Sequence, residues 1–226
     1  MDIMLSYLLI FISLAITLGA QAFVSTSYSK YSKILNKKNI KGSEAARIIL
    51  DQNGLSNVKV CKVNGYLTDH YDPESKVVNL SSSNFEKESI GAVAVACHEC
   101  GHAIQDKVGY TFMRIRASLI PIVNFSSYAG YFAILLGCIF GSLNLIWAGI
   151  ISEIIILIFQ LVTLPVEIDA SKRAIKELQK YELLDKDEIS GGKVMLTSAA
   201  LTYVASISTT IIQILRLILL FDRDDR

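Results

Sequence analysis

Four long stretches of apolar residues constrain this fold more than any other feature of the sequence. They cover residues 3–24, 119–140, 143–164 and 199–221. Each matches the roughly 20 residues that an α-helix needs to cross the hydrocarbon core of a bilayer. Because 52% of the 226 residues are also hydrophobic, we expect a mainly α integral membrane protein with four transmembrane helices.

The first apolar stretch is interpreted as a membrane anchor and not as a cleaved signal peptide. The tripeptide AQA at residues 20–22 resembles a cleavage site, but no basic residue precedes the apolar run. The run is also longer than the h-region of about 7–15 residues that is usual in signal peptides.

Basic residues predict on which side of the membrane the aqueous parts lie. Lysine and arginine are concentrated between the first and second spans and directly after the third, whereas residues 141–142 between the second and third spans carry no charge. The positive-inside rule therefore places both basic segments in the cytoplasm, with a cell-membrane, multi-pass location. A net charge of +1 gives no reason to expect a nucleic acid as a partner.

These signals divide the chain into five predicted parts. Residues 1–24 form the N-terminal anchor, 25–116 a cytoplasmic α+β domain, 117–164 a transmembrane hairpin, 165–197 a cytoplasmic helix, and 198–226 a last span with a short tail. In the α+β domain we expect helices at 43–53 and 85–107 and strands at 58–63 and 76–80, with 76–80 as a candidate edge strand. Ser43 is the expected N-cap of the first helix and Gly54 its end.

The stretch CHECGH at residues 97–102 contains the strongest chemical signal. His98 and His102 are four positions apart, so on a helix both imidazoles project from one face and can bind one zinc ion. Glu99 can then accept a proton from a water whose pKa the metal lowers toward ~7. Cys97 and Cys100 point more than about 100° away from the two histidines, so we interpret them as small buried packing residues.

A catalytic zinc site needs a third protein ligand, and two candidates remain. His70 lies in a polar turn and could be a ligand or could donate to the transition-state oxyanion. Glu167 follows two spans after His102, which returns it to the same membrane face, and we favour it as the ligand. Asp169 and Ser171 are candidates for holding an imidazole N–H.

Two sequence stretches resemble a known family. HECGHA at residues 98–103, followed after two spans by EIDAS at 167–171, resembles the YugP-type membrane neutral zinc metallopeptidases, and so does LTDHYDP at 67–73. The chain is more distantly similar to the HtpX and CAAX prenyl protease gluzincins, although Ser171 stands where that group has an aspartate. The resemblance implies His98, His102 and Glu167 as zinc ligands and Glu99 as the general base.

The prediction is therefore a zinc-dependent metalloendopeptidase of the gluzincin kind, with one Zn²⁺ ion in a small cytoplasmic zincin-like domain. Its expected partners are the bilayer and membrane-associated protein or peptide substrates, which could pair with the strand at 76–80. Two alternatives stay open: an intramembrane site-2-type protease and a non-catalytic zinc-binding scaffold. Glu153 and Arg216 lie inside spans and could pair with each other, or Arg216 could extend to the outer surface.

Overall fold

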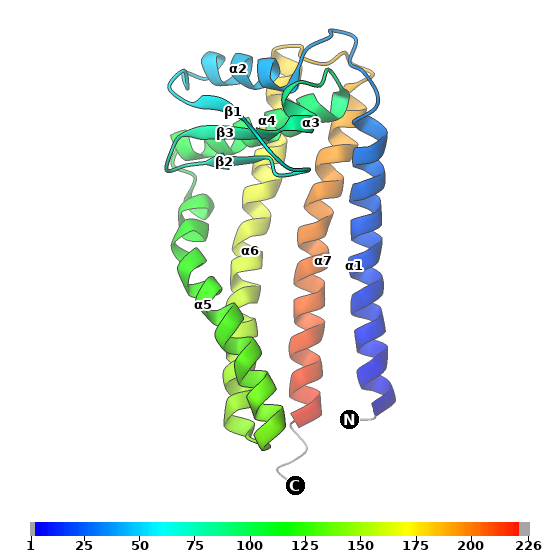
Figure 1. The fold of residues 1–226 in the computed structure, drawn as a ribbon, viewed down its shortest axis with the longest axis vertical. Helices are drawn as coiled ribbons and strands as arrows, with labels where there is room; N and C mark the ends of the chain where they lie inside the picture. The colour runs from blue at the N-terminus through cyan, green and yellow to red at the C-terminus, as the bar shows by residue number, and fades with distance from the viewer. Residues whose placement is uncertain (1–2, 222–226) are drawn as a thin grey trace. The chain divides into compact units, whose positions relative to one another are not determined.

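The structure is a computed structural model that describes residues 3–221; the predicted tail at 222–226 lies outside these residues. Its elements in chain order (Figure 1) are α1 (Ile3–Tyr31), α2 (Gly42–Gln52), β1 (Lys59–Val63), β2 (His70–Asp72), β3 (Val77–Ser81), α3 (Ser82–Phe85), α4 (Ile90–Lys107), α5 (Thr111–Phe140), α6 (Leu143–Lys180) and α7 (Ile189–Phe221). The chain divides into two compact units, which are described separately.

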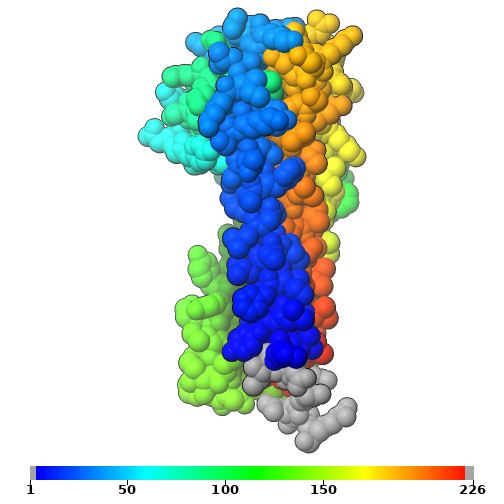
Figure 2. Space-filling model, turned by 90° about the vertical axis from the view of Figure 1, so that its right-hand side faces the viewer, coloured from blue at the N-terminus to red at the C-terminus, as the bar shows by residue number. Residues whose placement is uncertain are grey.

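The first unit contains the apolar parts of the four long helices, at residues 3–21, 114–165 and 201–221. Within the described chain, α1, α5, α6 and α7 are long and apolar enough to cross a membrane, so each predicted span is a helix that is a candidate to cross the bilayer. The start of α1 lies beside the end of α7 in both Figures 1 and 2. Large apolar side chains of α1 are exposed, including Phe11 at 65%, as expected of a helix whose solvent is lipid.

The second unit, residues 22–113 and 166–200, contains a three-stranded sheet with the order β1-β3-β2. β1 pairs with β3 in parallel, and β2 pairs with β3 antiparallel, with His70 opposite Asn79. Helices α2 and α4 pack against each other and against the sheet. The core is formed by fully buried aliphatic side chains from these helices and from β3, among them Ile49, Leu50, Val78, Leu80 and Val93.

The strand predicted at 76–80 forms as β3, but the prediction that it is an edge strand is wrong. The segment expected to be only a polar turn contributes β2, which occupies the second side of β3. A tight turn makes this pairing possible: Asp72 accepts hydrogen bonds from the backbone N–H groups of Glu74 and Ser75 at 2.9 and 3.3 Å, and Lys76 has a positive φ of 54°. A substrate therefore cannot pair with β3, because both of its sides are already bonded.

The helices of the second unit begin at other residues than predicted. α2 begins at Gly42, ahead of the expected cap Ser43, and the Glu44 carboxylate accepts the backbone N–H of Lys41 at 2.9 Å. The helix ends as expected before Gly54, whose φ is +63°. The helix predicted from residue 85 begins at Ile90 instead, because the Ser89 hydroxyl accepts the backbone N–H of Ala92 at 3.1 Å and caps α4. The short helix α3 ends at Phe85, before this start.

The helix predicted after the third span is continuous with that span, since α6 runs from Leu143 to Lys180 with Pro165 inside it. The predicted domain boundaries at residues 25, 117, 165 and 198 stay a prediction.

Candidate metal centre

Helix α4 presents the two histidines of the motif on one face. The imidazole rings of His98 and His102 are 4.8 Å apart between centroids and stand edge to face. His102 is 8% exposed, and the alanines of the preceding turns are fully buried. The four-residue spacing therefore places both rings together, as predicted.

Gly101 determines how closely α6 approaches this face. A Cβ atom at Gly101 would lie 2.5 Å from the carbonyl oxygen of Ala170 in α6, a distance that no side chain tolerates. The missing side chain allows the α6 backbone to lie directly on α4 at Gly101. Glu167 stands about one turn before Ala170 and is thereby brought opposite the imidazoles.

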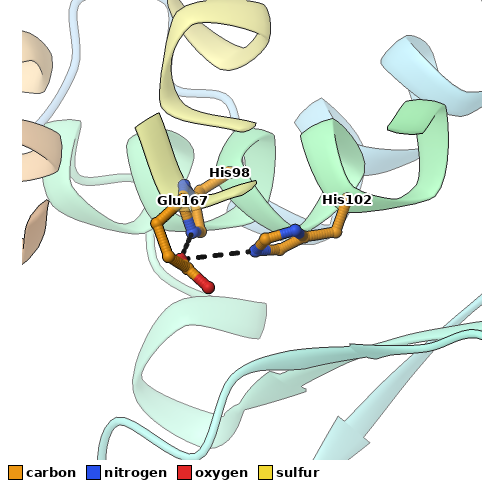
Figure 3. A group of neighbouring side chains, drawn as sticks. All are labelled: His98, His102 and Glu167. Carbon is orange, nitrogen blue, oxygen red and sulfur yellow. Dashed lines mark hydrogen bonds and ion pairs between the residues drawn. The ribbon is translucent and has the colours of Figure 1, made fainter. Parts of the chain in front are cut away.

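The three side chains converge on one point (Figure 3). Oε2 of Glu167 lies 3.2 Å from Nε2 of His98 and 3.6 Å from Nε2 of His102. All three ligand atoms lie within 4.8 Å of one another. Residues 69 positions apart in sequence thus form one compact cluster that could hold a metal ion.

The outer nitrogen of His102 is held by a residue that the sequence reasoning missed. Nδ1 of His102 lies 3.0 Å from Oε1 of Gln105, whose Nε2 donates to the Val166 carbonyl at 2.8 Å and to Asp169 at 2.9 Å. Asp169 also accepts from Nε of Arg173 at 2.6 Å. Gln105 stands one turn after His102 on the same helix face, but the spacing alone does not show that its amide is held by α6.

Ser171 and Asp169, the two predicted partners of the imidazoles, take different positions. The Ser171 hydroxyl lies 3.3 Å from Nδ1 of His98, so this residue is in direct contact with a histidine. Asp169 reaches His102 only through Gln105. The outer nitrogens of both rings are thus occupied, which leaves the two Nε2 atoms facing Glu167.

His70 lies outside this cluster. It is exposed in β2, with Nδ1 2.9 Å from the Thr68 carbonyl and Nε2 3.1 Å from the side-chain amide of Asn79. Both ring nitrogens therefore have protein partners. Among the described residues, the grouping of metal-ligating atoms contains His98, His102 and Glu167 without His70.

Comparison with known proteins gives this cluster a context. A family model described as "Putative neutral zinc metallopeptidase" matches residues 6–222. The chain belongs to this zinc metallopeptidase family. It is also 41% identical over 218 residues to "Putative membrane protease YugP" of Bacillus subtilis (strain 168), covering 96% of this chain and 97% of that one. No solved structure matches this chain.

The family finding confirms the resemblance stated from the sequence and implies zinc as the metal. Four ligands arranged tetrahedrally at about 2.0–2.1 Å from zinc are separated from one another by about 3.4 Å. The distances from Glu167 to the two histidines, 3.2 and 3.6 Å, lie on either side of this value. These two distances are therefore compatible with a metal ion shared by the cluster.

Charge within the cluster also suits a metal. Burial by itself lowers the pKa of His102, but the neighbouring Glu167 carboxylate raises it, and the net pKa lies above the ordinary histidine value. Without metal, this carboxylate thus favours the protonated form of His102. A metal needs neutral imidazoles, so metal binding would displace that proton.

Glu99 is the buried carboxylate beside the first histidine. Its side chain is 7% exposed, and burial raises its pKa. The described chain supplies it with no hydrogen bond or ion pair. Glu99, which the sequence predicts as the general base, therefore lies next to the cluster. No donor in the described chain forms a hydrogen bond with its carboxylate.

The two cysteines of the motif face the protein core, as predicted. Cys97 and Cys100 are both fully buried, and the Cys100 thiol donates to the Ala46 carbonyl at 3.6 Å. Burial raises the pKa of both thiols. They pack α4 against α2 and take no part in the cluster.

Proposed function

We propose that this chain is a membrane-embedded, zinc-dependent metalloendopeptidase that hydrolyses peptide bonds at the cytoplasmic membrane face. The convergence of His98, His102 and Glu167 on one point is the observation that carries the proposal. The family and the related membrane protease support the same class of activity. The proposed ligand set, two histidines on one helix and a glutamate on a later one, is that of a gluzincin.

In the proposed reaction His98, His102 and Glu167 would hold one zinc ion, which polarises a carbonyl and lowers the pKa of water. Glu99 accepts a proton from the attacking water on its carboxylate while the new C–O bond forms. The same carboxylate then gives the proton to the amine nitrogen as the C–N bond breaks. Ser171 and Gln105 hold the imidazole rings in the orientation that directs both Nε2 atoms to the ligand position.

Two observations bear on the alternatives. Helix α4 is not among the four described helices that are long and apolar enough to span a membrane, which favours an aqueous peptidase over a site-2-type enzyme. The cluster supplies three protein ligands, whereas structural zinc sites use four. This difference favours a catalytic site over a scaffold, since it provides one position for water or substrate.

The substitution Glu99→Gln tests the mechanism. The variant should bind zinc like the wild type, because its ligands are unchanged, and should lose roughly 10²–10⁴-fold in peptide hydrolysis. Glu86→Gln is the matched control, since Glu86 is exposed and paired with Lys62 at 2.8 Å, and should keep full activity. Zinc content by atomic absorption and cleavage of a fluorogenic peptide provide the two readouts. A zinc-loaded Glu99→Gln protein that cleaves at the wild-type rate would refute the mechanism.

The cytoplasmic orientation is part of the same proposal and depends on the distribution of basic residues. In sealed, inside-out vesicles a protease added outside should cut the loop at residues 64–68. In right-side-out vesicles the same loop should be protected. The reverse pattern would place the cluster on the outer face.

A further inference from the structure

A cavity of about 430 Å³ lies within the first unit. Its lining comes from three of the long helices and includes Ser126, Ser127 and Gly130 of α5, Ser152 and Glu153 of α6, and Gln213 of α7. These small and polar side chains share the lining with apolar ones, among them Ile134 and Ile156. Glu153 is the acidic group in this lining.

The Glu153 carboxylate has no partner among residues 3–221. Two hydroxyls of the lining are occupied within their own helices, because Ser127 donates to the Val123 carbonyl at 2.8 Å and Ser152 to that of Ala148 at 3.0 Å. Arg216 does not pair with Glu153, and its Nε is itself buried without a partner in the described chain. The pairing of Glu153 with Arg216, one of two sequence-based alternatives, is therefore not formed.

The position of Glu153 along α6 makes an unpaired carboxylate costly. Glu153 stands ten residues after Leu143, the first residue of α6, which is about 15 Å along a helix axis. That is half of the roughly 30 Å hydrocarbon core. A charge at this depth is expensive unless it faces water or a partner of opposite charge.

The cavity is open on the side of α5. Tyr131 and Leu135 belong to its lining and are 67% and 42% exposed. A Cβ atom at Gly130 would lie 2.5 Å from Cβ of Ser152, so α5 and α6 are in close contact at Gly130. Another helix in the membrane would reach Glu153 from the exposed side of the lining.

We propose that this cavity docks a transmembrane helix of a substrate protein, and that a lysine or arginine near the middle of that helix pairs with Glu153. Charge complementarity selects the occupant, because an unpartnered carboxylate at mid-membrane depth is stabilised by a cation on an apolar helix. Calling the docked protein a substrate rests on the proposed peptidase function, whereas the pairing of Glu153 with a lysine or arginine does not. The enzyme would thereby recognise a membrane protein through its span.

Binding of synthetic helices in vesicles tests this inference. The full-length chain is reconstituted in phosphatidylcholine vesicles with a labelled single-span peptide that carries lysine at its centre, and association is measured by energy transfer. An otherwise identical peptide with leucine at that position is the reference. We expect the wild type to bind the lysine peptide about 5–10-fold more tightly, in line with polar contacts between membrane helices.

Three variants sharpen the result. Glu153→Gln should lose the preference for lysine, and Glu153→Lys should instead prefer a peptide with a central glutamate. Gln160→Leu is the matched control, since it changes a polar residue of the same helix that already donates to Ser206 at 3.0 Å, and it should keep the preference. Zinc content equal to that of the wild type shows that each variant is folded.

Equal binding of the lysine and leucine peptides by the wild type would overturn the inference, as would a preference that survives in Glu153→Gln. All measurements are repeated in a Glu99→Gln background, where the peptide is not consumed. Because energy transfer reports association without cleavage, a zinc-loaded wild-type protein that selects the lysine peptide but cleaves no peptide would contradict the proposed peptidase and leave the docking site intact.

Discussion

Two of the three glutamates on helix α6, Glu167 and Glu153, have surroundings that differ in almost every respect. Glu167, in the second unit, is 6% exposed and lies within 3.6 Å of two imidazoles. Glu153, fourteen residues earlier in the first unit, is half-buried and lacks a partner in the described chain. The first carboxylate is positioned by its own protein, which suits a resident metal. The second faces a cavity, which suits a partner that binds reversibly.

The comparison shows that the two carboxylates differ in the partner groups around them. Around Glu167, donors and acceptors extend outward through Gln105, Asp169 and Arg173. Around Glu153, neighbouring hydroxyls bond to their own backbone. A buried polar group is stabilised only when its partners are supplied. We therefore expect substitutions at the two positions to affect different properties.

The largest effect is expected from Glu167→Ala. Loss of a ligand should weaken zinc affinity by more than the ~100-fold that loss of an outer partner can cost, and activity should disappear with the metal. His70→Ala should retain zinc. Glu177→Ala is a second control, since Glu177 is equally buried on the same helix but accepts from Asn53 at 2.7 Å. Zinc loss in His70→Ala, with retention in Glu167→Ala, would reverse the ligand assignment.

An intermediate effect is expected from Gln105→Leu. His102 would lose the acceptor that fixes its ring, and zinc affinity should fall about 10–100-fold. Competition with a chelator of known affinity measures this change. The exposed Gln52 at the end of α2 provides the matched change Gln52→Leu, which should leave zinc affinity unaltered. Unchanged affinity in Gln105→Leu would show that the network around Glu167 is not needed for the metal.

The smallest effect is expected from Glu153→Leu on the stability of the chain alone. The substitution removes no ion pair and no hydrogen bond within the described chain. The free energy of unfolding in detergent should therefore rise, or fall by less than about 1 kcal/mol. Gln160→Leu, which breaks a contact between α6 and α7, should cost about 0.6 kcal/mol. A clear loss of stability in Glu153→Leu would mean that Glu153 has a structural partner and would remove the contrast with Glu167.

Much of the candidate site could be predicted because its signals are local. The spacing of His98 and His102 depends only on helix geometry, and counting two spans placed Glu167 on the same membrane face as a candidate ligand beside His70. Gln105 was missed because nothing in the sequence shows that a glutamine one turn after a histidine has its amide held by another helix. The pairing of β2 with β3 was missed because a three-residue strand leaves almost no periodicity.

The sequence by itself determined the four apolar helices, the pair of histidines with their glutamate, and the burial of the two cysteines, since all of these depend on composition and on spacing within one element. Only the tertiary structure decided which groups meet across elements. It brings Glu167 onto the histidines because Gly101 lets the α6 backbone lie on α4, and it leaves Glu153 and Arg216 apart. Contacts between distant segments depend on packing, and packing is a property of the whole fold.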